Sequence, residues 1–256
     1  MNSLSSVVFV ASVVALLCGC DNRPDRTLSP PPGAQWVTVR FRVPEGITLR
    51  PAEALYRSER CQSVRYDSRD EPYDIPGYND TERPFVPQGD GRVRTLRVAV
   101  DGGGSCQWQL KSLKVSFSIA DDNPLVKGKE VFDTSYIFDF GDYGLSDGYG
   151  TGRAKAVSGD LDLKTDFFPM IFINHMFKKT TLELFGGDTD YKKWSRRYRL
   201  SNTSIINISP LVHLNKPVRL ESPEPPPGDI MAYYPDGRHG KIPHIYPDYD
   251  KLLSMK

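Results

Sequence analysis

Apolar and polar residues alternate along many short stretches of this chain, and this period of two is the feature that most constrains its fold. In the first stretch, Val37–Val43, apolar residues alternate with Thr38, Arg40 and Arg42. A period of two is typical of a strand that buries one face. Similar stretches predict further strands at Leu96–Val100, Leu113–Ile119, Tyr136–Phe140, Phe168–Ile173, Thr181–Phe185, Ser204–Ile208 and Val218–Leu220.

Clusters of Gly, Asp, Asn and Pro separate these stretches, as at Asp101–Gly104 and Gly186–Asp188, and such clusters are typical of turns. Many short strands with turns of this kind predict a mainly β, antiparallel β-sandwich-like domain over residues 36–221. Helical signals are few. Residues 51–60 fit either a short helix with Pro51 in its first turn or a strand that leads into Cys61, and residues 251–255 fit one terminal helical turn.

The N-terminal segment carries no charged side chain before Asp21. Its apolar run, Val7–Leu17, is too short to span a bilayer and ends in small residues, as a secretory signal does. Residues 17–20, Leu-Cys-Gly-Cys, resemble the lipobox of bacterial lipoproteins. The resemblance implies that residues 1–19 are a signal peptide that is removed and that Cys20 becomes the lipidated first residue. The alternative is a plain cleaved signal with an incidental Cys.

A lipidated Cys20 implies a protein anchored in the bacterial cell envelope and facing the periplasm. A multiply acylated Cys anchors stably, because each buried CH₂ contributes about 0.8 kcal/mol. Asp21-Asn22 resembles the pattern that retains enterobacterial lipoproteins in the inner membrane, so the inner membrane is favoured over the outer. Residues 20–35 contain three consecutive prolines and predict a Pro-rich tether that lifts the domain off the membrane.

Cys61 and Cys106 remain once Cys18 has left with the signal and Cys20 carries lipid. In an oxidising compartment the two are expected to form a disulfide, and two buried free thiols are the alternative. No Cys and His spacing resembles a zinc site, so no metal and no cofactor are predicted.

The charge balance gives no support for nucleic-acid binding, because 33 basic and 32 acidic residues are interspersed along the chain. The densest basic patch combines Lys192-Lys193 with Arg196-Arg197. We interpret this patch as a solvated face, with a phosphate or lipid-headgroup site as the alternative.

Residues 144–148, Gly-Leu-Ser-Asp-Gly, match the nucleophile elbow of serine hydrolases. The elbow needs a helix after the serine, whereas Gly-rich residues 149–152 follow here. Ser146 is therefore kept only as an alternative nucleophile, and no catalytic residue is predicted. His239 and His244 could hold a metal together with Asp236 or Asp248, but an extended, Pro-containing segment does not bring ligands together reliably.

Residues 222–256 combine seven prolines with Tyr233, Tyr234, Tyr246 and Tyr249. Proline excludes the segment from a central strand, while disordered tails are poor in aromatic residues. We therefore expect an extended strap on the domain surface. It either packs on its own domain or binds a protein partner through its tyrosines, which offer a large contact area with a polar tip.

The sequence favours protein binding over catalysis, because it offers a scaffold, varied loops and an aromatic segment but no assembled catalytic set. In size, lipobox and single Cys pair the chain resembles the small envelope lipoproteins that are immunity proteins against interbacterial toxins such as secreted lipases. The resemblance implies a toxin held in the periplasm by occlusion of its active site. The alternatives are a structural or assembly lipoprotein of an envelope machine and a serine hydrolase that uses Ser146.

Overall fold

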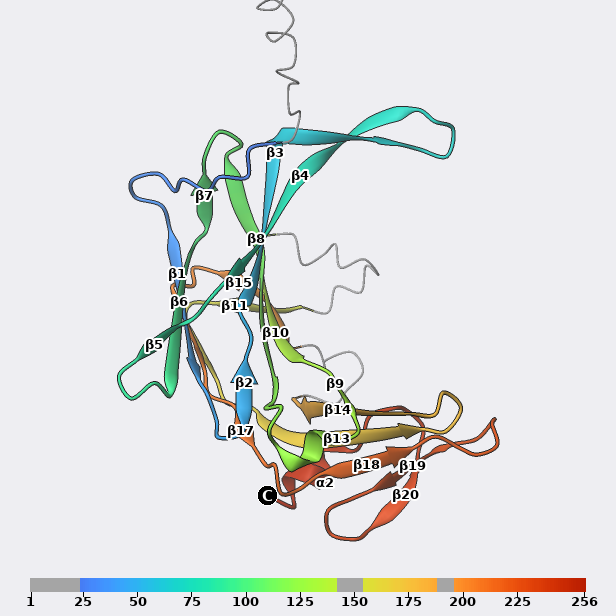
Figure 1. The fold of residues 1–256 in the computed structure, drawn as a ribbon. Coiled ribbons are helices and arrows are strands. Elements are labelled where there is room, and N and C mark those ends of the chain that lie inside the picture. The colour runs from blue at the N-terminus through green and yellow to red at the C-terminus, as the bar shows by residue number, and fades with distance from the viewer. Residues whose placement is uncertain (1–23, 142–153, 188–195) are drawn as a thin grey trace, which may run out of the picture.

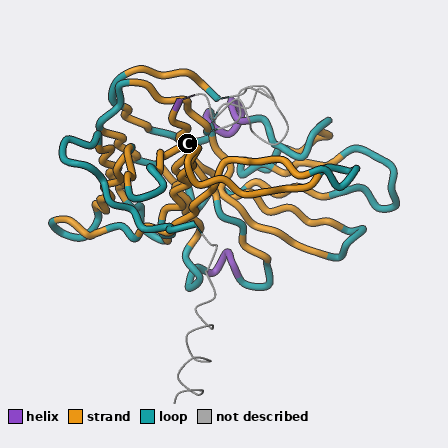
Figure 2. The backbone as a smooth tube through the Cα atoms, turned by 90° about the horizontal axis from the view of Figure 1, so that it is seen from above, coloured by secondary structure: helices purple, strands orange, loops and turns teal. Residues whose placement is uncertain are grey.

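Three mixed β-sheets make up most of the protein in the computed structural model, which describes residues 24–141, 154–187 and 196–256 (Figure 1). Figure 2 shows that strands dominate the backbone and that helix is confined to short pieces. The prediction of a mainly β, sandwich-like domain is confirmed. The helical pieces include a 3₁₀ turn at Pro124–Val126 and helix α2 at Tyr249–Leu253.

Sheet 1 has the strand order β12-β16-β1-β6-β5. Its strands are β1 (Trp36–Arg42), β5 (Val86–Gln88), β6 (Val93–Ala99), β12 (Leu161–Leu163) and β16 (Ile205–Ile208). The central strand β1 pairs antiparallel with β6 and parallel with β16. The predicted antiparallel arrangement therefore holds only in part, since a period of two marks a half-buried strand without stating the direction of its neighbours.

Sheet 2 has the order β11-β15-β10-β8-β3-β4, and β2 and β7 also pair with β8. Its strands are β2 (Ile47–Leu49), β3 (Ala52–Tyr66), β4 (Pro72–Arg83), β7 (Asp101–Gly103), β8 (Trp108–Ile119), β10 (Thr134–Phe140), β11 (Lys155–Ser158) and β15 (Arg197–Ser201). The stretch 51–60 is a strand rather than a helix. Every second side chain from Ala52 to Tyr56 points into the core. In a helix, residues two apart lie on different faces, so a helix could not bury all three.

Sheet 3 has the order β20-β19-β18-β13-β14-β9, and β17 pairs with β13. Its strands are β9 (Glu130–Val131), β13 (Asp166–Asn174), β14 (Lys179–Gly186), β17 (Leu211–Val212), β18 (Val218–Glu221), β19 (Ile230–Tyr233) and β20 (His239–Ile242). Its last two strands come from the segment predicted to be an extended strap. They form a hairpin that continues the sheet.

The main core lies between the inward faces of the sheets. Val37, Val39 and Phe41 of β1 are fully buried, as the alternation predicts. Phe117 of β8 is in contact with the ring of Phe41 at a centroid distance of 5.3 Å and with the ring of Phe167 at 5.2 Å. Burial of such rings is the main stabilising contribution, about 1.5–3 kcal/mol for each side chain that is fully removed from water.

A second, smaller core joins sheet 3 to the C-terminal helix. Its buried residues are Phe168, Met170, Phe185, Val218, Leu220, Ala232, Tyr234 and Leu252. Helix α2 supplies Leu252, and the carboxylate of Asp248 caps the helix by accepting a hydrogen bond from the backbone N–H of Lys251 at 3.0 Å. The C-terminal segment is therefore an integral part of the domain.

The hairpin of β3 and β4 extends beyond the body of the molecule, and Figure 1 shows it running sideways at one end. Up to Arg57, β3 pairs with both β8 and β4, whereas residues 63–66 pair with β4. We call residues 59–76 the arm. A disulfide between Cys61 and Cys106 links the base of the arm to the turn before β8, which confirms the predicted pairing.

The N-terminal segment lies against the domain from Asp25 onward, which differs from the predicted free tether over residues 20–35. The indole Nε1 of Trp108 donates to the carbonyl of Asp25 at 3.0 Å, and the side-chain amide of Asn79 donates to the carbonyl of Arg26 at 2.8 Å. At Gly104, φ is +73° and an added Cβ would lie 2.4 Å from the carbonyl oxygen of Thr27. Glycine is therefore needed there for the close approach.

Within the described residues, we find no helix whose length and apolar character would let it cross a membrane.

Candidate binding pocket

The hairpin of β19 and β20 forms the free edge of sheet 3. Tyr233 pairs with His239, and the N–H of Tyr234 donates to the carbonyl of Arg238 at 2.8 Å. The prolines of the segment all fall outside these two strands, so they do not interrupt the ladder. Two short strands can therefore form in a segment whose overall proline content argues against them.

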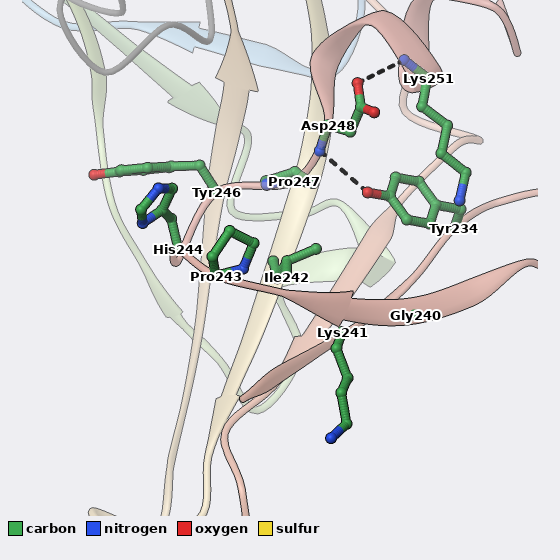
Figure 3. A pocket seen from close by; sticks show the side chains of 10 residues that line it. All are labelled: Tyr234, Gly240, Lys241, Ile242, Pro243, His244, Tyr246, Pro247, Asp248 and Lys251. Carbon is green, nitrogen blue, oxygen red and sulfur yellow. Dashed lines mark hydrogen bonds between the residues drawn. The ribbon is translucent and has the colours of Figure 1, made fainter. Parts of the chain in front are cut away.

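A pocket of about 600 Å³ lies between this hairpin and the chain that returns to α2 (Figure 3). Its lining residues are Tyr234, Gly240, Lys241, Ile242, Pro243, His244, Tyr246, Pro247, Asp248 and Lys251. Apolar side chains from β20 and the following loop, Ile242, Pro243 and Pro247, make up much of the wall. The pocket has the size and the mixed lining that are common in binding sites.

Polar groups at the pocket include Asp248 and Lys251 at the start of α2, Tyr234 after β19 and His244 in the loop after β20. The Lys251 ammonium lies 3.6 Å from the centre of the Tyr234 ring, a cation–π contact. The backbone N–H of Asp248 donates to the Tyr234 hydroxyl at 3.1 Å. Burial raises the pKa of Tyr234, so its phenol stays neutral around neutral pH. Lys241 points away from the other lining residues in Figure 3.

The four tyrosines predicted to bind a partner are largely engaged within the protein. Tyr234 is only 7% exposed, and the Tyr249 hydroxyl donates to the Asp166 carbonyl at 2.9 Å. The Tyr246 ring stacks on Phe185 at 6.0 Å, and Arg219 lies 4.3 Å from the centre of the Tyr233 ring. A partner-binding role for them stays a prediction, and Tyr233, Tyr246 and Tyr249 are half-exposed.

Asp166 of β13 holds the C-terminal end of the chain in place. Its carboxylate contacts the imidazole Nε2 of His213 at 2.7 Å and the ammonium of Lys256 at 2.9 Å. Burial alone raises the pKa of Asp166, but the hydrogen bonds and charges of His213 and Lys256 outweigh that effect and hold the pKa below its ordinary value. The ionised carboxylate is thus the form that fastens the segment.

We expect acid to loosen the C-terminal segment. A carboxyl with a depressed pKa stabilises the folded state above its unfolded pKa of about 3.9, and this stabilisation is lost as pH falls through the lower, folded value. Backbone NMR signals of Leu252 should therefore weaken or shift as the pH falls below about 4, before global unfolding. In Asp166→Asn the signals should already be perturbed at pH 7. A pH response in this variant equal to that of the wild type would contradict this role for Asp166.

Two arginines of the predicted basic patch are structural. Arg197 of β15 forms an ion pair with Asp139, which is fully buried in β10. Arg196 donates through Nε to the carbonyl of Ser135 at 3.0 Å, and it also donates to the carbonyl of Gly186. The bond to Gly186 connects sheet 3 to the start of β15, and the other two contacts lie within sheet 2. The interpretation of the two arginines as a solvated face is therefore wrong. Lys192-Lys193 lies outside the described residues.

The remaining predicted sites are not brought together. Cys20 and Ser146 lie outside the described residues. His239 stacks on Tyr233 at 5.8 Å, and His244 lies in the pocket wall. In the part of the chain that the structure describes, His, Cys, Asp and Glu side chains form no group of three or more that could hold a metal ion.

Sequence reasoning missed two features, the pocket and the arm. The pocket forms where residues 240–251 turn back toward Tyr234. No local sequence pattern predicts such a turn. A sequence signal for the arm does exist, because Tyr66 and Tyr73 flank the polar turn Asp67–Glu71. The second strand was not predicted because Pro72 and Pro76 argue against a strand.

Comparison of the chain with protein-family models, with curated proteins and with solved structures finds no match.

Proposed function

We propose that this protein is a lipid-anchored domain facing the periplasm that acts by binding a protein partner, as an immunity protein that holds a secreted toxin inactive. The observation that carries the proposal is the 600 Å³ pocket in the C-terminal segment, with its apolar wall and the cation of Lys251 beside it. The lipobox-like residues 17–20 support export and anchoring, and the disulfide suits an oxidising compartment.

The position of the pocket in the molecule suits this role. Residues 24–35 and the arm lie at one end of the molecule, while sheet 3 and α2 lie at the other (Figure 1). An anchor at Cys20 leaves the pocket on the end that points into the periplasm. A partner can then reach the pocket without meeting the membrane.

The chemistry of the pocket indicates what the partner offers. Ile242, Pro243 and Pro247 suit an apolar side chain that is removed from water on binding. Lys251 and His244 suit a carboxylate next to that side chain. We therefore infer that the partner inserts a loop with an apolar residue beside an acidic one. Such a central, desolvated anchor usually accounts for most of the binding energy of an interface.

The test reverses the charge of the pocket. His244→Glu with Lys251→Glu should weaken binding to the proposed cognate toxin by more than tenfold, which corresponds to about 1.4 kcal/mol. Binding is measured by calorimetry, and protection is measured in susceptible cells that express the toxin in the periplasm. Lys241→Glu is the matched control, because Lys241 lies on the same hairpin but points away.

The outcomes separate the competing functions. The melting temperature of each variant shows whether α2 still packs. Full protection by a folded double variant would rule out the pocket as the interface. Protection that is lost in a folded Ser146→Ala variant would favour the serine hydrolase instead.

A further inference from the structure

The path of the N-terminal segment determines how far the domain can be from the proposed anchor. The Ser105 hydroxyl donates to the Asp25 carboxylate at 2.8 Å, in addition to the hydrogen bond from Trp108 to the Asp25 carbonyl. Further along, the N–H of Ser29 donates to the carbonyl of Gly102 at 2.8 Å. The chain is therefore attached to the domain from Asp25.

Only residues 21–24 separate Cys20 from this point of attachment. Five residue steps of fully extended chain span at most about 17 Å. A free tether that continued to residue 35 would have allowed about 50 Å by the same measure. The end of the domain that holds Asp25 must therefore stay close to the membrane surface.

The arm leaves the body at this same end. Asn79, which follows the arm on β4, donates to the carbonyl of Arg26, and the disulfide of the arm ends in the turn that also contains Ser105. Figure 1 shows the arm running sideways from there. The arm is thus held at the level of the anchor.

One face of the arm is mostly apolar and carries one carboxylate. Val64 and Tyr66 are 56% and 66% exposed, and they pair across the hairpin with Asp74 and Pro72, respectively. Paired residues project on the same side of a hairpin, and residues two apart share that side. The opposite face carries Arg65 and Tyr73, which are also paired. Val64, Tyr66 and Pro72 outnumber the Asp74 carboxylate on their side, and exposed apolar residues on a projecting hairpin indicate a contact surface.

The turn of the arm is polar and stays in water. It holds Asp67, Asp70 and Glu71 against a single cation, Arg69. Hydrogen bonds from the N–H groups of Glu71 and Arg69 hold the pKa of Asp67 below its ordinary value. Anionic headgroups repel such a turn, so an arm near a membrane lies along the surface and does not enter it with the turn first.

We propose that the arm lies along the membrane surface with its Val64–Tyr66 face in the phospholipid headgroup region. The proposal rests on the proposed lipid anchor at Cys20. Tyrosine suits this position because its ring is apolar and its hydroxyl stays hydrated, as in the aromatic belts of membrane proteins. Contact at the anchor and along the arm gives the domain one orientation, with sheet 3 facing away from the membrane.

Photo-crosslinking of the full chain in its native envelope tests the contact. A benzoylphenylalanine in place of Tyr66 should form adducts with phospholipid, detected by mass spectrometry. The same probe in place of Phe177, which is 68% exposed in the turn between β13 and β14, should form none. Protein adducts at Tyr66 without lipid adducts would show that the arm binds a partner protein and would overturn the proposal.

A spacer variant tests the role of the short anchor. Twenty Gly and Ser residues inserted after Arg23 add a root-mean-square reach of about 25 Å, so the lipid adducts at Tyr66 should fall at least fivefold. An unchanged yield of lipid adducts would show that the short chain between Cys20 and Asp25 does not keep the arm near the membrane. Fatty-acid labelling separates the two proposals: an unlabelled Cys20 removes the anchor itself, whereas a labelled Cys20 without lipid adducts at Tyr66 overturns the arm contact alone.

Discussion

Replacing Cys61 by Ser should lower the melting temperature by about 8–16 °C. The disulfide joins residues 45 positions apart, and closing a loop of that length stabilises the fold by about 4 kcal/mol in the chain-entropy model. For a domain of this size, each kcal/mol corresponds to about 2–4 °C in melting temperature. Differential scanning calorimetry of the mature protein measures the shift.

The same substitution should release the arm. The hydroxyl of Ser58 accepts hydrogen bonds from the N–H groups of Arg60 and Cys61, and it donates to the carbonyl of Cys106. On the partner strand, an added Cβ at Gly77 would lie 2.0 Å from the carbonyl oxygen of Cys61. The base of the arm is therefore packed around the disulfide. Trypsin should cut the variant at Arg60 or Arg65 sooner than the wild type.

Two comparisons control this experiment. The double variant Cys61→Ser with Cys106→Ser has no free thiol at these positions. It therefore shows whether the effect of the single variant comes from the free Cys106 thiol. Reduction of the wild type should reproduce the shift. If the reduced and oxidised proteins melt at the same temperature, the disulfide contributes nothing to folding stability, and the rigidity of the arm must come from Ser58 and the strand pairing.

The alternation of apolar and polar residues predicted the fold class, because a strand that buries one face shows this alternation within its own few residues. β1, β8 and β10 show it clearly, since their inward residues are fully buried aromatic or branched side chains. The strand β4 was missed because Pro72 and Pro76 are tolerated only at a free edge, which the sequence does not reveal. Parallel pairs such as β1 with β16 join residues far apart in the chain, so no local pattern specifies them.

The candidate sites were harder to predict for a related reason. The tyrosines of the C-terminal segment were recognised as unusual, but their burial depends on sheet 3 and α2 packing together. Arg196 and Arg197 were taken as a solvated face because adjacent basic residues normally are. Their carbonyl and carboxylate partners lie on other strands, at Gly186 and, far away in sequence, at Ser135 and Asp139. Such tertiary partners determine whether a charged side chain is structural.

Replacing Trp108 by Ala should destabilise the protein as strongly as loss of the disulfide. The indole is fully buried and is the largest side chain in the main core. Trp→Ala changes in cores cost about 3–5 kcal/mol through lost burial and the cavity left behind. The melting temperature should therefore fall by about 6–20 °C.

Trp108→Phe separates the two roles of the indole. Phe fills most of the space but has no N–H, so the carbonyl of Asp25 loses its donor, at a cost of about 1 kcal/mol. The N-terminal segment should then open locally, and trypsin should cleave after Arg26 in a protein that is otherwise folded. With Asp25 released, the chain between Cys20 and the domain lengthens, and lipid adducts at Tyr66 should decrease. A Trp108→Phe protein whose segment resists trypsin as well as the wild type would show that Asn79 and Ser29 suffice to hold it.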